Sequence, residues 1–315
     1  MERRQFIQLG AAALLGACAP SIPRPATPLD AAAFRAERRF ADLQYGKIAY
    51  VERGSGPAAV FLHGAPLNGF QWRGAIERLA GLRRCIALDF MGLGYSEVPA
   101  AQSVAPAAQV AMVAALMDAL GIADADLVAS DSGGAVAQLF AVAHPDRVRT
   151  LLLTDCDVEP DSPPAKVKPA IEMARAGTLA DATAKWLTDP QLARSTFGAA
   201  VYRDPSQLAD ATIAYYVTPL VSSPVRRAQY HAFHVGLEPN PLAGVTAALA
   251  RSTIPVRIVW GDADDIFVLA DAEYLDRSFP RSRGIRRVPG GKLFFPEEFP
   301  DVIAEEARRL WAANR

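Results

Sequence analysis

The chain has 315 residues, with 33 Lys and Arg against 34 Asp and Glu, so its formal net charge is −1. With 51% hydrophobic and 21% charged residues, it has the composition of a globular protein and not of a disordered one. The near-neutral charge, without a run of basic residues, excludes nucleic acid as the expected partner. Three cysteines are too few for a disulfide framework.

The first 18 residues are organised like an export signal. Arg3 and Arg4 precede a mostly apolar run from Phe6 to Ala17. This run is about half as long as the roughly 20 residues that a membrane-spanning helix needs. It ends at Cys18 in a sequence that resembles a bacterial lipobox, although a small-residue cleavage site containing a cysteine looks similar. We therefore expect export to the bacterial periplasm or cell envelope, with Cys18 as a candidate lipid anchor to a membrane.

A proline-rich tether over residues 19–36 precedes the fold, which begins with a hairpin near Arg39–Glu52. Short apolar runs then predict buried strands, and segments with helical spacing lie between them. The predicted strands are Ala58–Leu62, Cys85–Leu88, Asp126–Ala129 and Val148–Leu153, and the predicted helices cover 71–79, 107–120 and 133–144. This alternation predicts a parallel sheet covered by helices on both faces.

The pattern changes at residue 155. Residues 155–245 contain prolines and helical segments but no convincing buried strand, which indicates a helical insertion. Strands are again predicted at 254–260 and 285–288, and helices at 270–277 and 300–311. The predicted organisation is a signal at 1–18, a tether at 19–36, an α/β core formed by 37–154 and 246–315, and a cap at 155–245.

The segment Val128–Gly134 predicts a sharp turn between a buried strand and a helix. Such a turn lifts its apical side chain above the sheet, and small residues beside the apex let the strand and the helix approach closely. Two frames fit the sequence. One places Asp131 at the apex between Ala129 and Gly133, and the other places Ser132 there between Ser130 and Gly134.

Three further motifs accompany this turn, at His63–Pro66, Asp89–Ser96 and Trp260–Asp264. Together they resemble the oxyanion loop, the Asp-x-x-Gly-x-Gly-x-Ser loop and the acid-bearing strand end of the α/β-hydrolase-fold family. The resemblance covers nearly all of the chain from residue 39 to 311. It implies an α/β fold with a mostly parallel eight-stranded sheet, flanking helices and a helical cap.

The family register favours Asp131 over Ser132 as the apex, because two glycines and then His144-Pro145 follow it at the expected positions. An aspartate there resembles haloalkane dehalogenases, fluoroacetate dehalogenases and epoxide hydrolases. In these enzymes the carboxylate attacks carbon and forms an alkyl ester, which a histidine-activated water then hydrolyses. The resemblance also implies an oxyanion pocket from the main-chain N–H groups of Ala65 and Ser132. Asp264 is the expected supporting acid, with Asp155 and Asp157 as the alternative position.

The resemblance fails at the histidine. The family's late motif resembles Pro-Gly-x-Gly-His-x-x-x-Glu-Glu, whereas Pro289–Glu298 has Leu293 in the place of histidine. An aspartate is ionised at neutral pH and attacks carbon without a base, whereas a serine needs one from the start. A missing general base costs about 10²–10⁴-fold in the step that it assists. We therefore expect alkylation of Asp131 followed by slow hydrolysis or a trapped ester.

Other side chains are candidates for the substrate pocket. They are His63, Tyr215, Tyr216, His231, His234 and Leu293. His231 and His234 stand three residues apart in the cap and suggest a substitute base or a metal pair, or simply two polar positions on a helix. Because no third metal ligand is evident, we expect neither a metal nor a cofactor.

Two functional hypotheses follow. The first is an exported hydrolase that uses Asp131 on a small apolar electrophile, with an epoxide ahead of a halide or an ester. The cap offers tyrosines that could polarise an epoxide oxygen, whereas Ser132 and Ala65 stand where dehalogenases carry halide-binding side chains. The second is a non-hydrolytic protein of the same fold that binds or isomerises an apolar ligand, as the loss of the histidine at 293 suggests.

Overall fold

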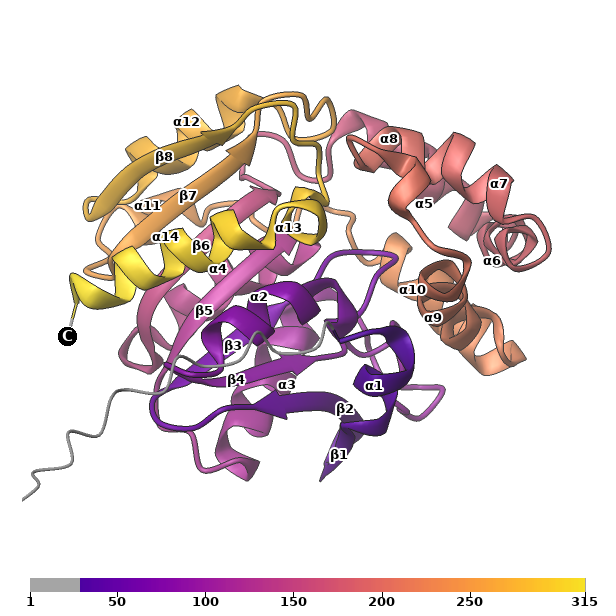
Figure 1. The fold of residues 1–315 in the computed structure, drawn as a ribbon, viewed down its shortest axis with the longest axis horizontal. Coiled ribbons are helices and arrows are strands. Elements are labelled where there is room, and N and C mark those ends of the chain that lie inside the picture. Colours follow the sequence, from indigo (N-terminus) through magenta and orange to yellow (C-terminus); the bar gives the residue numbers. More distant parts are fainter. Residues whose placement is uncertain (1–28, 315) are drawn as a thin grey trace, which may run out of the picture.

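A computed structural model describes residues 29–314. The predicted signal, Cys18 and most of the predicted tether lie outside these residues. The described chain forms an eight-stranded sheet in the order β1-β2-β4-β3-β5-β6-β7-β8 (Figure 1). Strand β2 is antiparallel to both of its neighbours, and the strands from β4 to β8 are parallel to one another. The predicted mostly parallel sheet is confirmed.

The strands lie close to their predicted positions. They are β1 (Arg38–Leu43), β2 (Gly46–Arg53), β3 (Ala58–Leu62), β4 (Arg84–Leu88), β5 (Ala125–Asp131), β6 (Val148–Cys156), β7 (Val256–Gly261) and β8 (Ser282–Val288). All residues of β3 and β5 are buried, as expected for central strands covered on both faces. Strand β6 continues past its predicted end at Leu153, and this extension places Asp155 within the strand.

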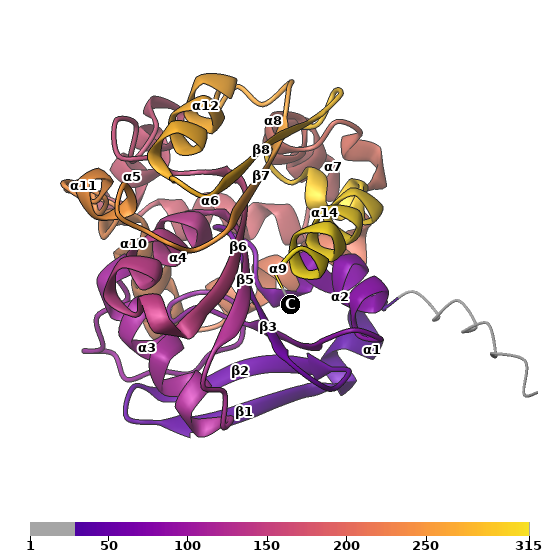
Figure 2. The same cartoon turned by 90° about the vertical axis from the view of Figure 1, so that its left-hand side faces the viewer.

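Helices cover both faces of the sheet. The core helices are α1 (Ala31–Ala36), α2 (Arg73–Leu79), α3 (Pro106–Ala119), α4 (Ser132–Ala143), α11 (Thr246–Leu249), α12 (Leu269–Ser278), α13 (Phe295–Glu298) and α14 (Pro300–Ala312), with short 3₁₀ helices η1 (Gly69–Trp72) and η2 (Pro145–Arg147). Helices α2 and α14 cover one face, and α3, α4 and α12 cover the other (Figure 2). This is the layered architecture that the βαβ alternation predicts.

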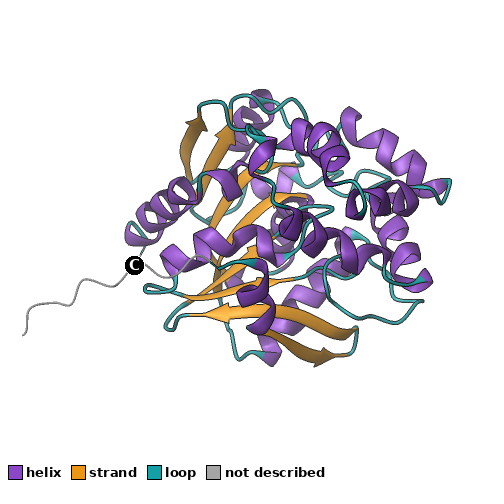
Figure 3. Ribbon diagram, turned by 45° about the vertical axis from the view of Figure 1, so that its right-hand side comes forward, coloured by secondary structure: helices purple, strands orange, loops and turns teal. Residues whose placement is uncertain are grey.

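The cap is built of helices and loops and lies over one end of the sheet, at the right of Figure 1 (see also Figure 3). Its elements are η3 (Ala165–Val167), α5 (Lys168–Arg175), α6 (Leu179–Ala184), η4 (Lys185–Leu187), α7 (Pro190–Ala193), the π-helical turn η5 (Arg194–Gly198), α8 (Ala199–Val201), η6 (Pro205–Gln207), α9 (Asp210–Val221) and α10 (Pro224–Val235). A helical insertion in this part of the chain was predicted.

The predicted end of the tether is wrong. Residues 31–36 form helix α1, whose first turn is capped because the Asp30 carboxylate accepts a hydrogen bond from the main-chain N–H of Ala33 at 2.8 Å. Phe34 is 2% exposed and packs edge-on against Phe70 and Tyr215. The buried ring of Phe34 therefore holds this segment against the core, although its small and polar residues are typical of a linker.

Buried polar contacts hold the cap against the core. The Glu297 carboxylate accepts hydrogen bonds from the hydroxyls of Tyr202 at 2.7 Å and Tyr216 at 2.9 Å, and it pairs with Arg73 at 2.5 Å. From α10, Arg226 donates to the main-chain oxygens of residues 93, 94 and 96 in the core. Because these groups are largely removed from water, the cap is fixed at two separate points.

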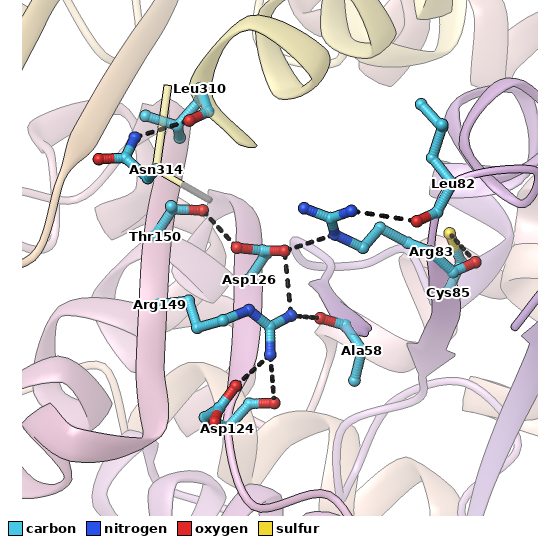
Figure 4. A network of polar contacts seen from close by, with 10 residues as sticks. All are labelled: Ala58, Leu82, Arg83, Cys85, Asp124, Asp126, Arg149, Thr150, Leu310 and Asn314. Carbon is cyan, nitrogen blue, oxygen red and sulfur yellow. Dashed lines mark hydrogen bonds and ion pairs between the residues drawn. The ribbon is translucent and has the colours of Figure 1, made fainter. Parts of the chain in front are cut away.

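A second polar network lies at the opposite end of the central strand (Figure 4). Asp126 is 1% exposed, and its carboxylate pairs with Arg83 at 2.8 Å and Arg149 at 3.0 Å and accepts from the Thr150 hydroxyl at 2.8 Å. Asp126 and Asp131 are five positions apart on this extended strand, which corresponds to about 16 Å. This network therefore anchors the strand that carries the turn at Asp131, without taking part in the site there.

No helix within residues 29–314 is long and apolar enough to cross a membrane. The same residues contain no cluster of three or more His, Cys, Asp or Glu side chains arranged to hold a metal ion.

Candidate active site

Asp131 occupies the turn between β5 and α4, and the apex lies there rather than at Ser132. Its φ of 55° is the only positive φ of a non-glycine residue in residues 29–314. At this strained turn, the start of helix α4 packs closely against neighbouring strands and loops on two sides. A Cβ on Gly133 would lie 2.5 Å from the His63 carbonyl oxygen, and one on Gly134 would lie 2.3 Å from the Cβ of Cys156. The small residues are therefore required by the packing of the turn.

Two main-chain N–H groups bind the Asp131 carboxylate. The N–H of Ala65 donates to Oδ2 at 2.9 Å, and the N–H of Ser132 lies close enough to the carboxylate to lower its pKa. A Cβ on Gly64 would lie 2.4 Å from the same Oδ2, so the loop approaches the carboxylate as only glycine allows. The predicted N–H pair thus lies at the Asp131 carboxylate, with Oδ2 held by the N–H of Ala65.

His63 supports this loop and does not reach the cavity. Its Nδ1–H donates to the Gly64 carbonyl at 2.9 Å, and its Nε2 accepts from the main-chain N–H of Phe90 at 2.9 Å. Burial lowers the pKa of His63 to about 4, so the ring is neutral at neutral pH. Both ring nitrogens are committed, and His63 therefore holds the turn between two loops.

Asp131 opens into a cavity of about 700 Å³ between the core and the cap. The wall is mainly apolar and includes Trp186, Phe197, Ile266 and Leu293. Its polar side chains other than lysine are those of Asp131, Ser132, Thr183, Thr196, Tyr230 and His234. Two exposed lysines, Lys166 and Lys185, stand at its edge. The size and the mostly apolar lining suit a small organic molecule.

The two candidate supporting acids lie together. Asp155 Oδ1 accepts from the N–H of Gly261 at 2.9 Å, and Asp264 Oδ1 accepts from the N–H of Ile266 at 2.8 Å. The two carboxyl groups lie close enough for each to affect the pKa of the other, and the Oδ2 atom of each is buried without a hydrogen-bond partner within residues 29–314. Burial, and then the charge of Asp264, raises the pKa of Asp155 well above its usual value, and burial raises the pKa of Asp264 to about 6. Burial therefore favours the protonated form of both carboxyl groups, and most strongly that of Asp155.

The environment also disfavours the ionised form of Asp131. Burial, and next the negative charge of Asp157, raises the pKa of Asp131 well above its ordinary value, against the opposing hydrogen bonds from Ser132 and Ala65. Burial raises the pKa of Asp157 itself to about 6. Within residues 29–314, no Lys, Arg or His forms an ion pair with Asp131, Asp155 or Asp264. These buried acids thus lack the cation that would favour their charged forms.

The histidines of the cap divide between two environments. His231 Nε2 accepts from the N–H of Ala180 at 2.9 Å, and His231 is not among the residues that line the cavity. His234 is 6% exposed and lines the cavity, and its Nδ1 lies 3.0 Å from the Tyr230 carbonyl oxygen. Within residues 29–314, neither ring hydrogen-bonds to Asp131. The structure therefore brings only His234 of this pair into the site.

The tyrosines at 215 and 216 lie outside the cavity wall. The Tyr215 hydroxyl accepts from Arg38 at 2.5 Å, and its ring packs at a tilt against the rings of Phe70 and Tyr95. The Tyr216 hydroxyl donates to Glu297. Both were candidates for the pocket because helical spacing turns one of two adjacent residues toward a neighbouring site. Both side chains instead contact residues of the core.

Leu293 is 4% exposed and lines the cavity. The next two residues, Phe294 and Phe295, are fully buried, and Phe294 packs against Phe197 and Tyr202 of the cap. The loop just before Leu293 contacts the loop that carries Asp264, because the N–H of Ala263 donates to the Gly291 carbonyl at 3.0 Å. Leu293 thus stands on the cavity wall, on a loop tied to the acid-bearing loop.

Sequence reasoning did not single out Trp186 and Thr183, which also line the cavity. Their helices could be predicted, but the spacing of polar and apolar residues does not show which helix face meets a cavity and which meets the core. A tryptophan and a threonine in a short amphipathic helix are ordinary packing residues by pattern alone.

The sheet order, the turn at Asp131 and the N–H pair define an α/β-hydrolase fold. The chain belongs to the alpha/beta hydrolase fold family, which residues 57–299 match. It is 28% identical over 283 residues to haloalkane dehalogenase 2 of Mycobacterium bovis, an alignment that covers 85% of this chain and 92% of that protein.

Solved structures show the same relationship. The structure of the haloalkane dehalogenase DbeA from Bradyrhizobium elkani matches with a TM-score of 0.71 and 26% identity, covering 88% of this chain and 98% of that one. The epoxide hydrolase CorEH matches with a TM-score of 0.72 and 25% identity, covering 88% and 99%. The chain is therefore a hydrolase-fold protein similar to haloalkane dehalogenases and epoxide hydrolases.

Proposed function

We propose that this protein is an alkyl-transfer hydrolase in which Asp131 attacks a small apolar electrophile. One observation carries the proposal. A buried carboxylate at a strained turn has Oδ2 held by the N–H of Ala65, lies beside the N–H of Ser132 and opens into a mostly apolar cavity. In the first step Oδ1 forms a bond to a saturated carbon, the bond from carbon to its leaving group breaks, and the leaving group departs with the electron pair.

The second step is hydrolysis of the ester. A water oxygen adds to Cγ of Asp131, and the negative charge develops on Oδ2, where the N–H groups of Ala65 and Ser132 stabilise it. The bond between Cγ and the alkyl oxygen then breaks, the alcohol leaves with one proton of the water, and the other proton remains on the restored Asp131 carboxyl group. Leu293 offers no proton acceptor to this step. We therefore propose that hydrolysis is slow relative to alkylation.

The hydrogen bonds of the cap favour a halide over an epoxide, which reverses the order expected from the sequence. An epoxide oxygen needs a donor as it develops negative charge. The hydroxyls of Tyr202 and Tyr216 donate to Glu297, and Tyr215 lies outside the cavity. Tyr230 lines the cavity, but its hydroxyl pairs with Thr183. A halide needs less assistance because it is a weak base and leaves as a stable anion.

The test is the mass of the intact protein after incubation with 1-bromohexane or 1,2-epoxyhexane. We expect a stoichiometric increase of one hexyl group with the bromide, mapped to the peptide that contains Asp131. Asp131→Asn keeps the size of the side chain but removes the nucleophile, and it should gain no mass. An adduct on another residue, or an equal adduct in the Asp131→Asn variant, contradicts the proposal.

A binding protein of the same fold is the second candidate, and Leu293 is the observation that favours it. An apolar side chain there extends the apolar cavity wall without offering a proton acceptor. No mass increase with any electrophile, together with a rise in melting temperature on adding apolar ligands, supports this alternative.

Export belongs to the same proposal and depends on the first 18 residues. We expect the protein to be found with the bacterial envelope and Cys18 to carry a lipid. Cell fractionation and labelling with a fatty-acid analogue test this, with Cys18→Ser as the matched variant. A labelled Cys18→Ser protein, or a wild-type protein confined to the cytoplasm, contradicts this part.

A further inference from the structure

The cap side of the cavity has a pattern of hydrogen bonds that leaves acceptors facing the ligand. The Thr183 hydroxyl donates to the Leu179 carbonyl at 2.9 Å, so it has no proton left for Tyr230. The 3.3 Å contact between the two hydroxyls is then a hydrogen bond from Tyr230 to Thr183. Tyr230 and Thr183 both line the cavity, and each retains only oxygen lone pairs for a ligand.

His234 continues this pattern on the same wall. A carbonyl oxygen only accepts, so the 3.0 Å contact with the Tyr230 carbonyl requires the proton to be on Nδ1. Nε2 is then the ring nitrogen with a lone pair, and the one side-chain hydrogen bond of His234 within residues 29–314 is the contact at Nδ1. The Tyr230 ring lies edge-on at 4.8 Å and fixes the imidazole. His234 therefore offers one directed acceptor to the cavity.

The core side of the cavity is complementary. There the N–H groups of Ala65 and Ser132 are donors, gathered around Asp131. A ligand that fits both walls has an end that becomes negative at Asp131 and a hydrogen-bond donor at the end that meets α10. An unsatisfied acceptor in a mostly apolar cavity is costly, so a ligand without a donor leaves His234 Nε2 unpaired on binding.

We propose that the substrate of this cavity carries a hydroxyl or N–H group remote from its reacting carbon, and that His234 Nε2 accepts its proton in a hydrogen bond. The proposal rests on the function proposed above for the reacting end. The selecting step itself is binding and needs no reaction. His234 is accordingly a specificity-determining residue rather than a base that replaces the missing one.

The ionisation states agree with this geometry. Burial lowers the pKa of His234 to about 4, so the ring is a neutral acceptor at neutral pH. Burial raises the pKa of Tyr230 to about 12, so its hydroxyl keeps its proton and its bond to Thr183. Neither group acquires a charge between pH 5 and 9, and the expected selectivity is constant over that range.

The test compares two isomers of one formula, 1-hexanol and methyl pentyl ether. Both have an oxygen near one end, but only the alcohol can donate a hydrogen bond. We expect wild-type protein to bind the alcohol about fivefold more tightly in calorimetry, which corresponds to one net hydrogen bond. His234→Phe keeps a ring without nitrogens and should reduce the ratio of the two affinities to about one. His234→Leu repeats the test with a smaller side chain.

His231→Phe is the matched control, since it removes an imidazole from the same helix outside the cavity wall. It should keep the wild-type ratio. The proposal is overturned if wild-type protein binds the ether as tightly as the alcohol, binds neither isomer, or keeps its preference in folded His234→Phe. Alkylation of Asp131 by 6-bromohexan-1-ol and by 1-bromo-5-methoxypentane is measured separately. Selective binding without any adduct refutes only the proposed reaction, and equal binding of the isomers with an adduct refutes only the role of His234.

Discussion

If the proposed mechanism holds, replacing Leu293 with histidine should speed hydrolysis of the Asp131 alkyl ester and allow repeated turnover. Leu293 lines the cavity that contains Asp131, and its loop is tied by the 3.0 Å hydrogen bond between Ala263 and Gly291 to the loop of Asp264. An imidazole at this position would face the cavity on one side and have Asp155 and Asp264 near its loop. A carboxylate that accepts from one ring nitrogen leaves the other free to take a proton from water.

The expected gain lies in the second step. General-base assistance contributes about 10²–10⁴-fold, so the lifetime of the Asp131 ester should shorten by that factor in Leu293→His. The substitution also buries a polar ring in place of a leucine. If the imidazole forms a hydrogen bond, the free energy of unfolding of the protein should fall by at most about 3 kcal/mol. The two effects are separable, because ester lifetime is measured on folded protein.

The assay follows the decay of the hexyl adduct by intact mass after excess bromide is removed, alongside release of bromide over many turnovers. Leu293→Gln is the control for polarity, since an amide does not take up a proton at neutral pH. Adding Asp264→Asn to the Leu293→His variant should abolish part of the increase in the rate of ester hydrolysis. If Leu293→His folds and is alkylated, yet its ester decays no faster than in Leu293→Gln, then a missing base is not what limits this site.

Three further outcomes are expected. Because the pKa of Asp131 is raised by burial and by Asp157, the rate of alkylation should rise with pH above pH 5, and a flat profile from pH 5 to 9 contradicts that environment. Asp157 has a folded pKa of about 6 against an ordinary 3.8, so its contribution to stability is lost as pH rises through 6; urea titrations of Asp157→Asn should show a gain of about 3 kcal/mol at pH 8 and none near pH 4. Glu297→Gln leaves Arg73 without its buried partner and should cost about 3 kcal/mol in the same titration, whereas an unchanged midpoint would show that the cap is held elsewhere.

The fold could be predicted because its signals are local. Short apolar runs and their loops define the strands, and the apex at Asp131 is marked by small residues that the turn needs for contact with His63 and Cys156. The loop at Ala65 and the loop at Asp264 follow strands whose ends meet at one edge of a parallel sheet. Their positions therefore follow once the strand order is known.

The side chains that line the cavity could not be predicted in the same way. Tyr215, Tyr216, Tyr230 and His234 all stand on helices α9 and α10, and the orientation of each helix depends on contacts with distant core residues such as Arg38 and Glu297. The pairing of Asp155 with Asp264 depends on where β6 ends, which the apolar pattern placed too early. Contacts between segments that are distant in the sequence determine these features, and the residue pattern within one segment does not predict such contacts.

The surroundings of Asp131 suggest that residue 293 affects alkylation as well as hydrolysis of the ester. From residue types alone, an aspartate is ionised at neutral pH, so the loss of a histidine harms only hydrolysis of the ester. In this structure burial and Asp157 hold the pKa of Asp131 well above that ordinary range, and a histidine near the cavity, once protonated, would supply the opposing charge. On the proposed mechanism, a leucine at position 293 would then leave Asp131 without an opposing charge as well as without a base. Leu293→His should then shift the pH profile of alkylation to lower pH in addition to shortening the ester lifetime, and a change in only one of the two would separate its charge from its basicity.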